Sequence, residues 1–173
     1  MTKLRNTKTL ALAAMLTAIG IILSFFKIPV NQLITIGFGS LPLSVSGMLL
    51  GPAVSGVVGA LMDIGGYLVK PTGPFFPGFT ISGIVSGVIY GLMFYKKKIT
   101  FTRVLVAQVI LTIVVNILMN SYWLKLLYLK DAYFAVIISR LPKEVIMLPI
   151  MTVMKYIVLK TIQEVKVFHL QVE

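Results

Sequence analysis

The chain has 173 residues, of which 58% are hydrophobic and only 12% are charged. Soluble domains average about 45–50% apolar and about 25% charged residues, so this composition indicates an integral membrane protein. Each helical span needs roughly 20 apolar residues, which leaves room for about six spans and little else. We therefore expect one membrane domain over residues 1–173, without an appended ATPase, soluble catalytic domain or DNA-binding domain.

The net charge of +11 arises from 16 basic and 5 acidic residues. Most of the basic residues flank apolar runs, so a lipid bilayer explains the excess better than a nucleic acid does. The chain contains no cysteine, a single histidine (His169) and no phosphate-binding P-loop motif. We therefore expect a binding protein without a metal site, a cofactor or a catalytic centre.

Apolar runs predict six helices in chain order, at about residues 9–26, 41–50, 53–69, 79–95, 104–119 and 132–161. The first follows a basic start without a convincing cleavage site, which favours an uncleaved span. The second is short for a bilayer. Residues 70–78, with three prolines and two glycines, cannot form a helix. The fifth run has an apolar continuation towards Leu129, and we expect interruptions of the sixth near Pro142 and Pro149.

Basic residues between the apolar runs fall into two groups, which predict the orientation of the chain. The larger group comprises Lys3, Arg5, Lys8, Lys96, Lys97, Lys98, Arg103, Lys155, Lys160 and Lys166. The smaller group comprises Lys27, Lys70, Lys125 and Lys130. Cytoplasmic loops carry an excess of lysine and arginine, so we expect both termini of this multi-pass cell-membrane protein to be cytoplasmic. This assignment requires the short second segment to cross the membrane.

Asp63 is an acidic residue inside the third apolar run. Ionisable residues within spans are costly and usually face the protein interior or a wet cavity, so Asp63 is a candidate ligand contact. A helix-cap or loop acid is the alternative, because Gly65-Gly66 and an outer loop follow shortly after it.

Charged residues also occur in the outer part of the last run, at Arg140, Lys143 and Glu144. Their spacings of three and four residues place Arg140 on a shared helix face with each of the other two. An intrahelical Arg140–Glu144 ion pair is one interpretation. A cationic site for an anionic substrate group is the other, since the arginine fork matches a carboxylate.

Amides and aromatic rings lie near the same predicted outer side. Asn116 and Asn120 share a helix face and are candidate cavity-lining residues. Tyr122 and Trp123 follow them and could equally belong to an interfacial aromatic belt. Three phenylalanines at the start of the fourth run could stack on a flat ligand, namely Phe75, Phe76 and Phe79.

Small residues recur at helical spacing in several runs. Ala14 and Ala18 lie four apart in the first run, a spacing that lets two helix backbones approach closely in lipid. Packing within the bundle and an interface with another subunit both fit this pair. Gly83, Gly87 and Gly91 form overlapping G-x-x-x-G steps, which favour tight packing inside the monomer.

The glycine and proline framework resembles the S component of an energy-coupling factor (ECF) vitamin transporter. The matching residues are Leu41-Pro42, Gly47, Leu50-Gly51-Pro52, Gly56, Gly59, Asp63, Gly66, Gly83, Gly87 and Gly91. The stretch Pro71-Thr72-Gly73-Pro74-Phe75-Phe76-Pro77-Gly78-Phe79-Thr80 is most similar to the folate-specific members, and Arg140-Leu141-Pro142-Lys143 also fits.

This resemblance implies an all-α bundle of six membrane helices that binds one vitamin from outside and delivers it inward. The expected partners are a membrane-embedded T component and two ATPases that supply the energy. The family's A-x-x-x-A motif docks the T component and maps to Ala14 and Ala18. The loop from Lys27 to Ser40 is expected to act as a lid, in which Gly37 and Gly39 permit movement.

Folate is the ligand that the resemblance favours, with a flat pterin and a glutamate tail. Asp63 or the asparagines could hold the pterin, and Phe75, Phe76, Phe79 or Trp123 could stack on it. Arg140, Lys143 or the lysines of the smaller, outer group could pair with the tail. Pantothenate is the alternative vitamin. A self-sufficient secondary transporter is the alternative mechanism, and an intramembrane enzyme is disfavoured because the spans lack a nucleophile–base pair.

Overall fold

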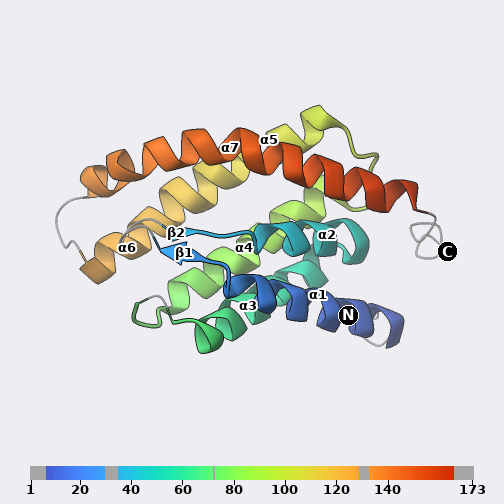
Figure 1. Ribbon diagram of the computed structural model, residues 1–173, viewed down its shortest axis with the longest axis horizontal. Helices are drawn as coiled ribbons and strands as arrows, with labels where there is room; N and C mark the ends of the chain where they lie inside the picture. Colours follow the sequence, from blue (N-terminus) through green and yellow to red (C-terminus); the bar gives the residue numbers. More distant parts are fainter. Residues whose placement is uncertain (1–6, 30–34, 72, 129–132, 166–173) are drawn as a thin grey trace.

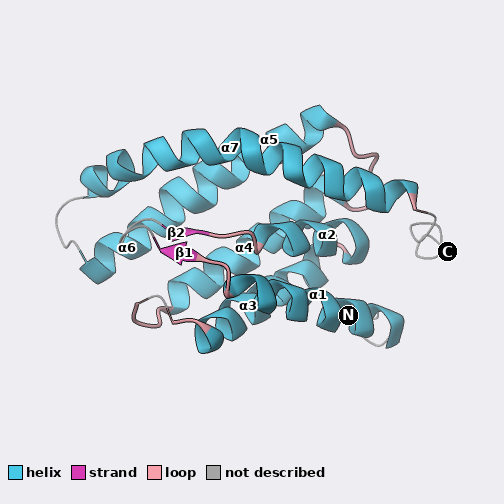
Figure 2. Ribbon diagram, in the orientation of Figure 1, coloured by secondary structure: helices cyan, strands magenta, loops and turns pink. Residues whose placement is uncertain are grey.

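A computed structural model describes residues 7–29, 35–71, 73–128 and 133–165 of the chain (Figure 1). Helices account for most of the described residues, as Figure 2 shows. They are α1 (Thr7–Ser24), α2 (Ser40–Leu50), α3 (Pro52–Val69), α4 (Pro77–Phe94), α5 (Phe101–Leu111), the π-helix η2 (Thr112–Met119), α6 (Asn120–Tyr128) and α7 (Tyr133–Glu164). Since α5, η2 and α6 are continuous, the predicted all-α bundle of six membrane helices is confirmed.

Two short strands lie between α1 and α2, where no regular structure was predicted. β1 (Ile28–Pro29) pairs antiparallel with β2 (Thr35–Ile36), with Ile28 opposite Ile36. Residues 37–39 then lead directly into α2 at Ser40.

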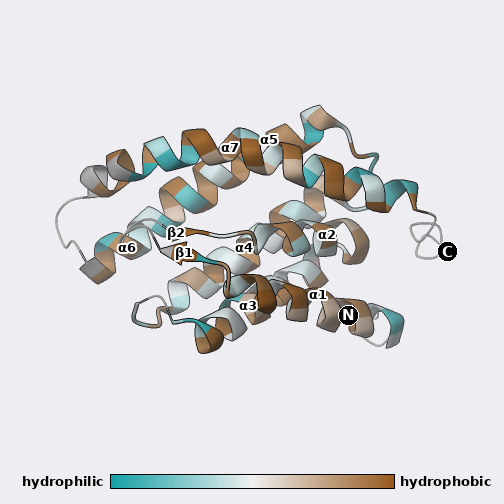
Figure 3. Cartoon of the chain, viewed as in Figure 1, coloured by the Kyte–Doolittle hydropathy of each residue, from teal (hydrophilic) through white to brown (hydrophobic). Residues whose placement is uncertain are grey.

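Within the described part of the chain, five helical segments are long and apolar enough to cross a membrane. They are Thr7–Ser24, Pro52–Val69, Pro77–Phe94, Phe101–Leu127 and Val136–Glu164. Figure 3 shows that hydrophobic residues recur along the helices. Many of them face outward, and Met15, Leu92 and Ile157 are each more than half exposed. Apolar residues on the outside are what a hydrocarbon environment requires of a helical bundle.

The helices begin where local chemistry favours a helix start. α3 and α4 both open on a proline, Pro52 and Pro77, whose missing N–H is not needed in a first turn. The turn before α3 uses Gly51 at φ 86°, a conformation that glycine adopts without steric cost. α5 begins after Thr100, whose side chain accepts a hydrogen bond from the Arg103 backbone N–H.

Three sequence expectations are wrong. α4 begins at Pro77, within residues 70–78, which were expected to contain no helix; a proline is compatible with the first turn of a helix. α7 runs unbroken through Pro142 and Pro149, both of which are exposed; in a membrane bundle, neighbouring groups and local adjustments can satisfy the backbone that a proline frees. Lys155 was expected among the basic residues at the cytoplasmic end, but only 1% of its surface is exposed and it lies inside the bundle.

The short helix α2 lies at the centre of the bundle. It packs against α1, α3, α4 and α7, and residues 42–48 are all buried. α1 begins and α7 ends at one end of the molecule, while β1, β2, the α3–α4 connection and the start of α7 gather towards the other (Figure 1). This second end carries the mouth of the cavity described below.

Glycines allow α3 and α4 to touch backbone to backbone. A Cβ atom on Gly59 would collide with the carbonyl of Gly83, and one on Gly87 would collide with the carbonyl of Ser55. The expectation that Gly83, Gly87 and Gly91 pack inside the monomer therefore agrees with this contact. Close backbone approach of this kind is a main source of helix association in lipid.

Gly59→Ala is expected to destabilise the protein by about 1–3 kcal/mol, because the new methyl group would force α3 away from α4. Gly56→Ala on the same helix is the matched control, since its Cβ would meet mainly the side-chain methyl groups of Val88 and Ile84. Thermal unfolding in detergent should show a larger fall in the midpoint for Gly59→Ala. Equal midpoints would contradict the backbone contact.

Candidate functional site

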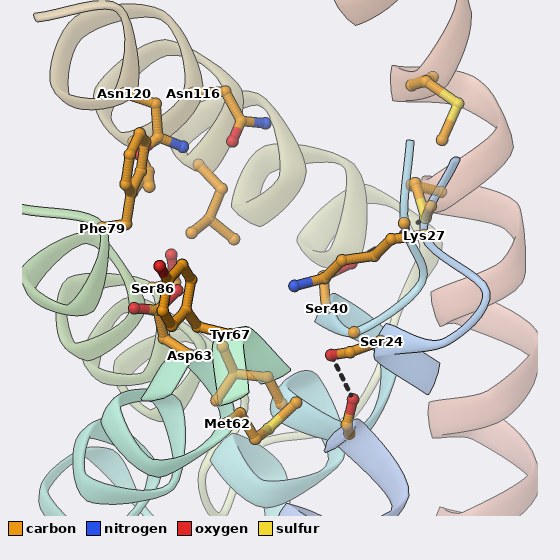
Figure 4. Close-up of a pocket in the computed structure, with 18 of the residues that line it drawn as sticks. Ser24, Lys27, Ser40, Met62, Asp63, Tyr67, Phe79, Ser86, Asn116 and Asn120 are labelled. Carbon is orange, nitrogen blue, oxygen red and sulfur yellow. Dashed lines mark hydrogen bonds between the residues drawn. The ribbon is translucent and has the colours of Figure 1, made fainter. Parts of the chain in front are cut away.

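A cavity of about 420 Å³ opens between the helices. Most of the residues that the sequence selected for ligand binding or for the lid line it, namely Gly37, Gly39, Asp63, Phe75, Phe76, Phe79, Asn116, Asn120, Arg140 and Lys143. Figure 4 shows Asp63, Tyr67 and Phe79 on one wall and Lys27 reaching in from another, with Asn116 and Asn120 above. Trp123 is the exception, because it does not line the cavity.

Asp63 lies within α3, more than a turn before the helix ends, so its position is not that of a cap. Thr80 on α4 donates a hydrogen bond from Oγ1 to Asp63 Oδ2 at 2.8 Å. The glycine contact between α3 and α4 makes this pairing possible, because Gly83 packs directly beside Asp63. One carboxylate is thus held in place at the cavity wall.

The sequence offered Lys27 only as one of several outer lysines that could pair with the ligand's carboxylates, and its side chain lines the cavity. Burial lowers the pKa of Lys27, while the opposite charge of Asp63 raises it and the like charge of Lys70 lowers it further. In the sequence, Lys27 stands directly after an apolar run. Lysines that merely flank a membrane span show the same pattern, so the sequence does not single out Lys27.

Lys70 fastens the loop that contains Lys27. Its Nζ donates to the carbonyl oxygens of Phe25 at 2.9 Å and Lys27 at 2.7 Å. These carbonyls follow the end of α1, where helical carbonyls lack intrahelical partners and favour a cation. The loop before β1 is therefore tied to the end of α3.

Glu144 on α7 is the second carboxylate of the cavity and only 4% of it is exposed. Lys143 Nζ lies 3.1 Å from Glu144 Oε1, and Asn116 Nδ2 donates to Oε2 at 3.0 Å. Arg140 Nη2 approaches Oε1 only to 4.0 Å. The intrahelical ion pair expected from the spacing is therefore present but long.

Arg140 keeps unused hydrogen-bonding capacity inside the protein. Its Nε and Nη1 are buried and have no hydrogen-bond partner within the described part of the chain, and the same is true of Asn120 Oδ1. Buried polar groups are normally paired, so such groups beside a cavity indicate where a ligand would bind. An arginine with two free N–H positions suits a carboxylate.

Aromatic side chains form one wall of the cavity. The rings of Phe76 and Phe79 lie 6.2 Å apart, and Phe75 packs at 5.1 Å from Tyr67. Trp123 stands behind Phe76 at 5.6 Å, and its Nε1 donates to Ser82 Oγ at 3.1 Å. Trp123 supports this wall and does not face the cavity.

A third polar group lies at the opposite end of the cavity from the loops. It contains Tyr90, Gln108 and Lys155, none of which was selected from the sequence. Lys155 was assigned there to a membrane-flanking cluster, although it stands within an apolar stretch of the last run.

The lining of the cavity combines aromatic rings with positive charge, a combination that suits an anion with a ring. Among the described residues of the lining near the loops are the four cations Lys27, Lys70, Arg140 and Lys143 and the two carboxylates Asp63 and Glu144, a surplus of two positive charges. Among the described residues, no group of three metal-ligating side chains occurs.

A separate apolar groove lies on the surface between α1 and α3. It is lined by Leu10, Ala13, Ala14, Thr17, Ala18, Ile21, Val54, Val57, Val58 and Leu61. Ala14 and Ala18 are exposed, whereas their neighbour Ala13 packs in the core. The pair therefore presents a smooth external face.

Comparisons with known proteins agree with one another. The family model for the ECF transporter, substrate-specific component, matches residues 8–159. The folate transporter FolT of Clostridium novyi (strain NT) is 37% identical over 166 residues, covering 96% of both chains. FolT of Leuconostoc mesenteroides subsp. mesenteroides is 32% identical over 159 residues, covering 89% of this chain and 85% of that protein.

A solved structure described as FolT bound with folic acid has the same fold, with a TM-score of 0.79. Its sequence is 37% identical to this chain, and the match covers 87% of this chain and 92% of the other.

Glu144→Gln is expected to destabilise the unliganded protein by about 3 kcal/mol, because Arg140 and Lys143 would lose the buried charge that compensates them. Glu164→Gln is the matched control, since the Lys160–Glu164 pair on the same helix is largely exposed and of similar spacing. Thermal unfolding without ligand should separate the two variants. A shift as large for Glu164→Gln would contradict this account.

Proposed function

We propose that this chain, which belongs to the family of ECF transporter substrate-specific components, binds folate from the outer side of the membrane. Family membership rests on the family match and on relatives above 30% identity over most of the chain. The relatives' folate specificity is extended to this chain because the cavity has the chemistry that folate requires.

The observation that carries the proposal is Arg140, buried beside the cavity with Nε and Nη1 unpartnered within the described residues. A buried guanidinium that is only partly neutralised favours a carboxylate ligand. Folate carries two carboxylates on its glutamate tail, which match the two positive charges in excess near the cavity mouth. Lys143 and Lys27 would complete this contact.

The pterin of folate is neutral and flat, and it presents two adjacent N–H donors. Asp63 is a fixed carboxylate that would accept from them, with Asn116 and Asn120 as further amide partners. Phe75, Phe76 and Phe79 would supply the apolar wall. Pantothenate has one carboxylate and no ring, so it matches neither the charge nor the aromatic wall.

The loop from Lys27 to Ser40, of which residues 30–34 lie outside the described part of the chain, would serve as the lid of the site. Gly37 and Gly39 line the cavity, and a Cβ on Gly37 would come within 3.0 Å of Lys27 Cγ. Lys70 anchors the beginning of this loop through its carbonyl contacts. The lid would therefore move about its glycine end rather than at its lysine end.

Transport by this chain would depend on partner subunits, as it does in the family whose model matches residues 8–159. We assign energy supply to two ATPases and a T component, as in the family. The exposed pair Ala14 and Ala18 would dock the T component along the groove between α1 and α3. The basic loop at Lys96–Lys98 and Lys160 lie at the end where α1 begins, which supports cytoplasmic termini.

Titration calorimetry on ligand-free protein should give tight binding of folic acid and none of comparable strength for pantothenate or riboflavin. Arg140→Ala should weaken the binding of folic acid by about 2–5 kcal/mol, because a buried carboxylate of the ligand would lose its partner. Lys160→Ala, an exposed cation on the same helix, should leave the affinity unchanged. Preference for pantothenate, or full affinity in Arg140→Ala, would refute the assignment.

Ala14→Trp should preserve folic acid binding and abolish copurification with the T component and ATPases, because the indole would fill the close-contact face. Met15→Trp is the control, since Met15 is exposed on a neighbouring face of α1. Uptake into vesicles by this chain alone would instead support a self-sufficient transporter.

A further inference from the structure

Lys155 on α7 is a buried cation. Neither the family resemblance nor the ligand contacts proposed near the mouth of the cavity assign it a role. Only 1% of its surface is exposed, and none of the ion pairs among the described residues includes it. Ionisable residues inside a membrane bundle are expensive, so they usually mark a functional site.

The amino group of Lys155 is held at a defined position. It donates to Tyr90 OH on α4 and to Gln108 Oε1 on α5, at 2.5 Å in the latter case. Its Nζ also lies 4.8 Å from the centre of the Tyr90 ring. A lysine ammonium has three N–H donors, so one remains without a partner among the described residues.

The amino group of Lys155 lies at the wall of the cavity, because Lys155 is among the residues that line it. Cα–Cβ bonds in a helix tilt towards its N-terminus, and α7 begins at the mouth end of the cavity. Lys155, Tyr90, Gln108 and Ser86 line the same cavity as Asp63 and Arg140. They form its floor together with the buried side chains of Leu111 and Met151.

The floor differs from the mouth in its chemistry. At the mouth, two carboxylates stand among four cations, whereas at the floor one cation stands among neutral hydroxyl and amide groups. The two carboxylates of a folate tail already balance the excess charge at the mouth. The group that meets the floor is then a neutral hydrogen-bond acceptor.

We propose that Lys155 contacts the ligand directly and donates a hydrogen bond to the 4-oxo oxygen of the pterin. The inference rests on the proposed function, because it requires folate in the cavity. Asp63 on the wall would accept from the N–H groups of the ring, and the adjacent carbonyl edge would face down to the floor. Lys155 thereby determines specificity for 4-oxo pterins over 4-amino pteridines.

The test compares folic acid with aminopterin, in which an amino group replaces the 4-oxo oxygen, by titration calorimetry. Lys155→Met should weaken the binding of folic acid by about 10- to 100-fold, which is the effect of losing a hydrogen bond from a charged donor. It should weaken the binding of aminopterin much less. The preference of the protein for folic acid should therefore shrink. Lys155→Gln, which keeps an N–H donor, should restore part of that preference.

Lys160→Met provides the matched control, because it removes an exposed cation from the same helix. Equal losses for both ligands in Lys155→Met would show that Lys155 only supports the fold, and unchanged folic acid affinity would show that it does not reach the ligand. Either result overturns the proposal. Failure of the unsubstituted protein to bind folic acid would instead refute the proposed function.

Discussion

The backbone contact between α3 and α4 is the constraint on which the rest of the structure depends. Gly59 meets Gly83 and Gly87 meets Ser55, with no room for a side chain at any of the three glycines. The contact brings Thr80 within hydrogen-bonding distance of Asp63 and so sets one wall of the cavity. In lipid, where apolar surface gives no net drive for helix association, such close packing is what holds two helices together.

Opposite this wall, α7 places three charged side chains inside the bundle, where unpaired charges are costly. Arg140, Lys143 and Glu144 neutralise one another in part, with Asn116 completing the carboxylate's contacts. Under the proposed function, the incomplete compensation leaves Arg140 N–H groups available to an anionic ligand, which a fully paired cluster would not offer. Stability of the unliganded protein and affinity for the ligand are thus set by the same few groups.

Much of the fold could be predicted from the sequence. The six apolar runs correspond to the helices of the bundle. The start of α4 at Pro77 lies within a stretch that was expected to contain no helix, because a proline in the first turn cannot be told from a helix-breaking one by residue type alone. Continuity of α7 through Pro142 and Pro149 could not be predicted, because a proline ends a helix only where nothing else satisfies the freed backbone. Likewise, the pairing of β1 with β2 is too short to leave a periodic pattern.

Residue type and spacing by themselves determined that this is a membrane bundle with charged and aromatic groups near one end, because composition and period depend only on the chain. The tertiary structure alone decided which of these groups share one cavity. Lys27 and Lys155 look like membrane-flanking lysines in the sequence, yet both line the cavity, whereas Trp123 stands behind its wall. Whether a side chain meets lipid, water or a ligand depends on the helices packed around it, and that information is not local to the residue.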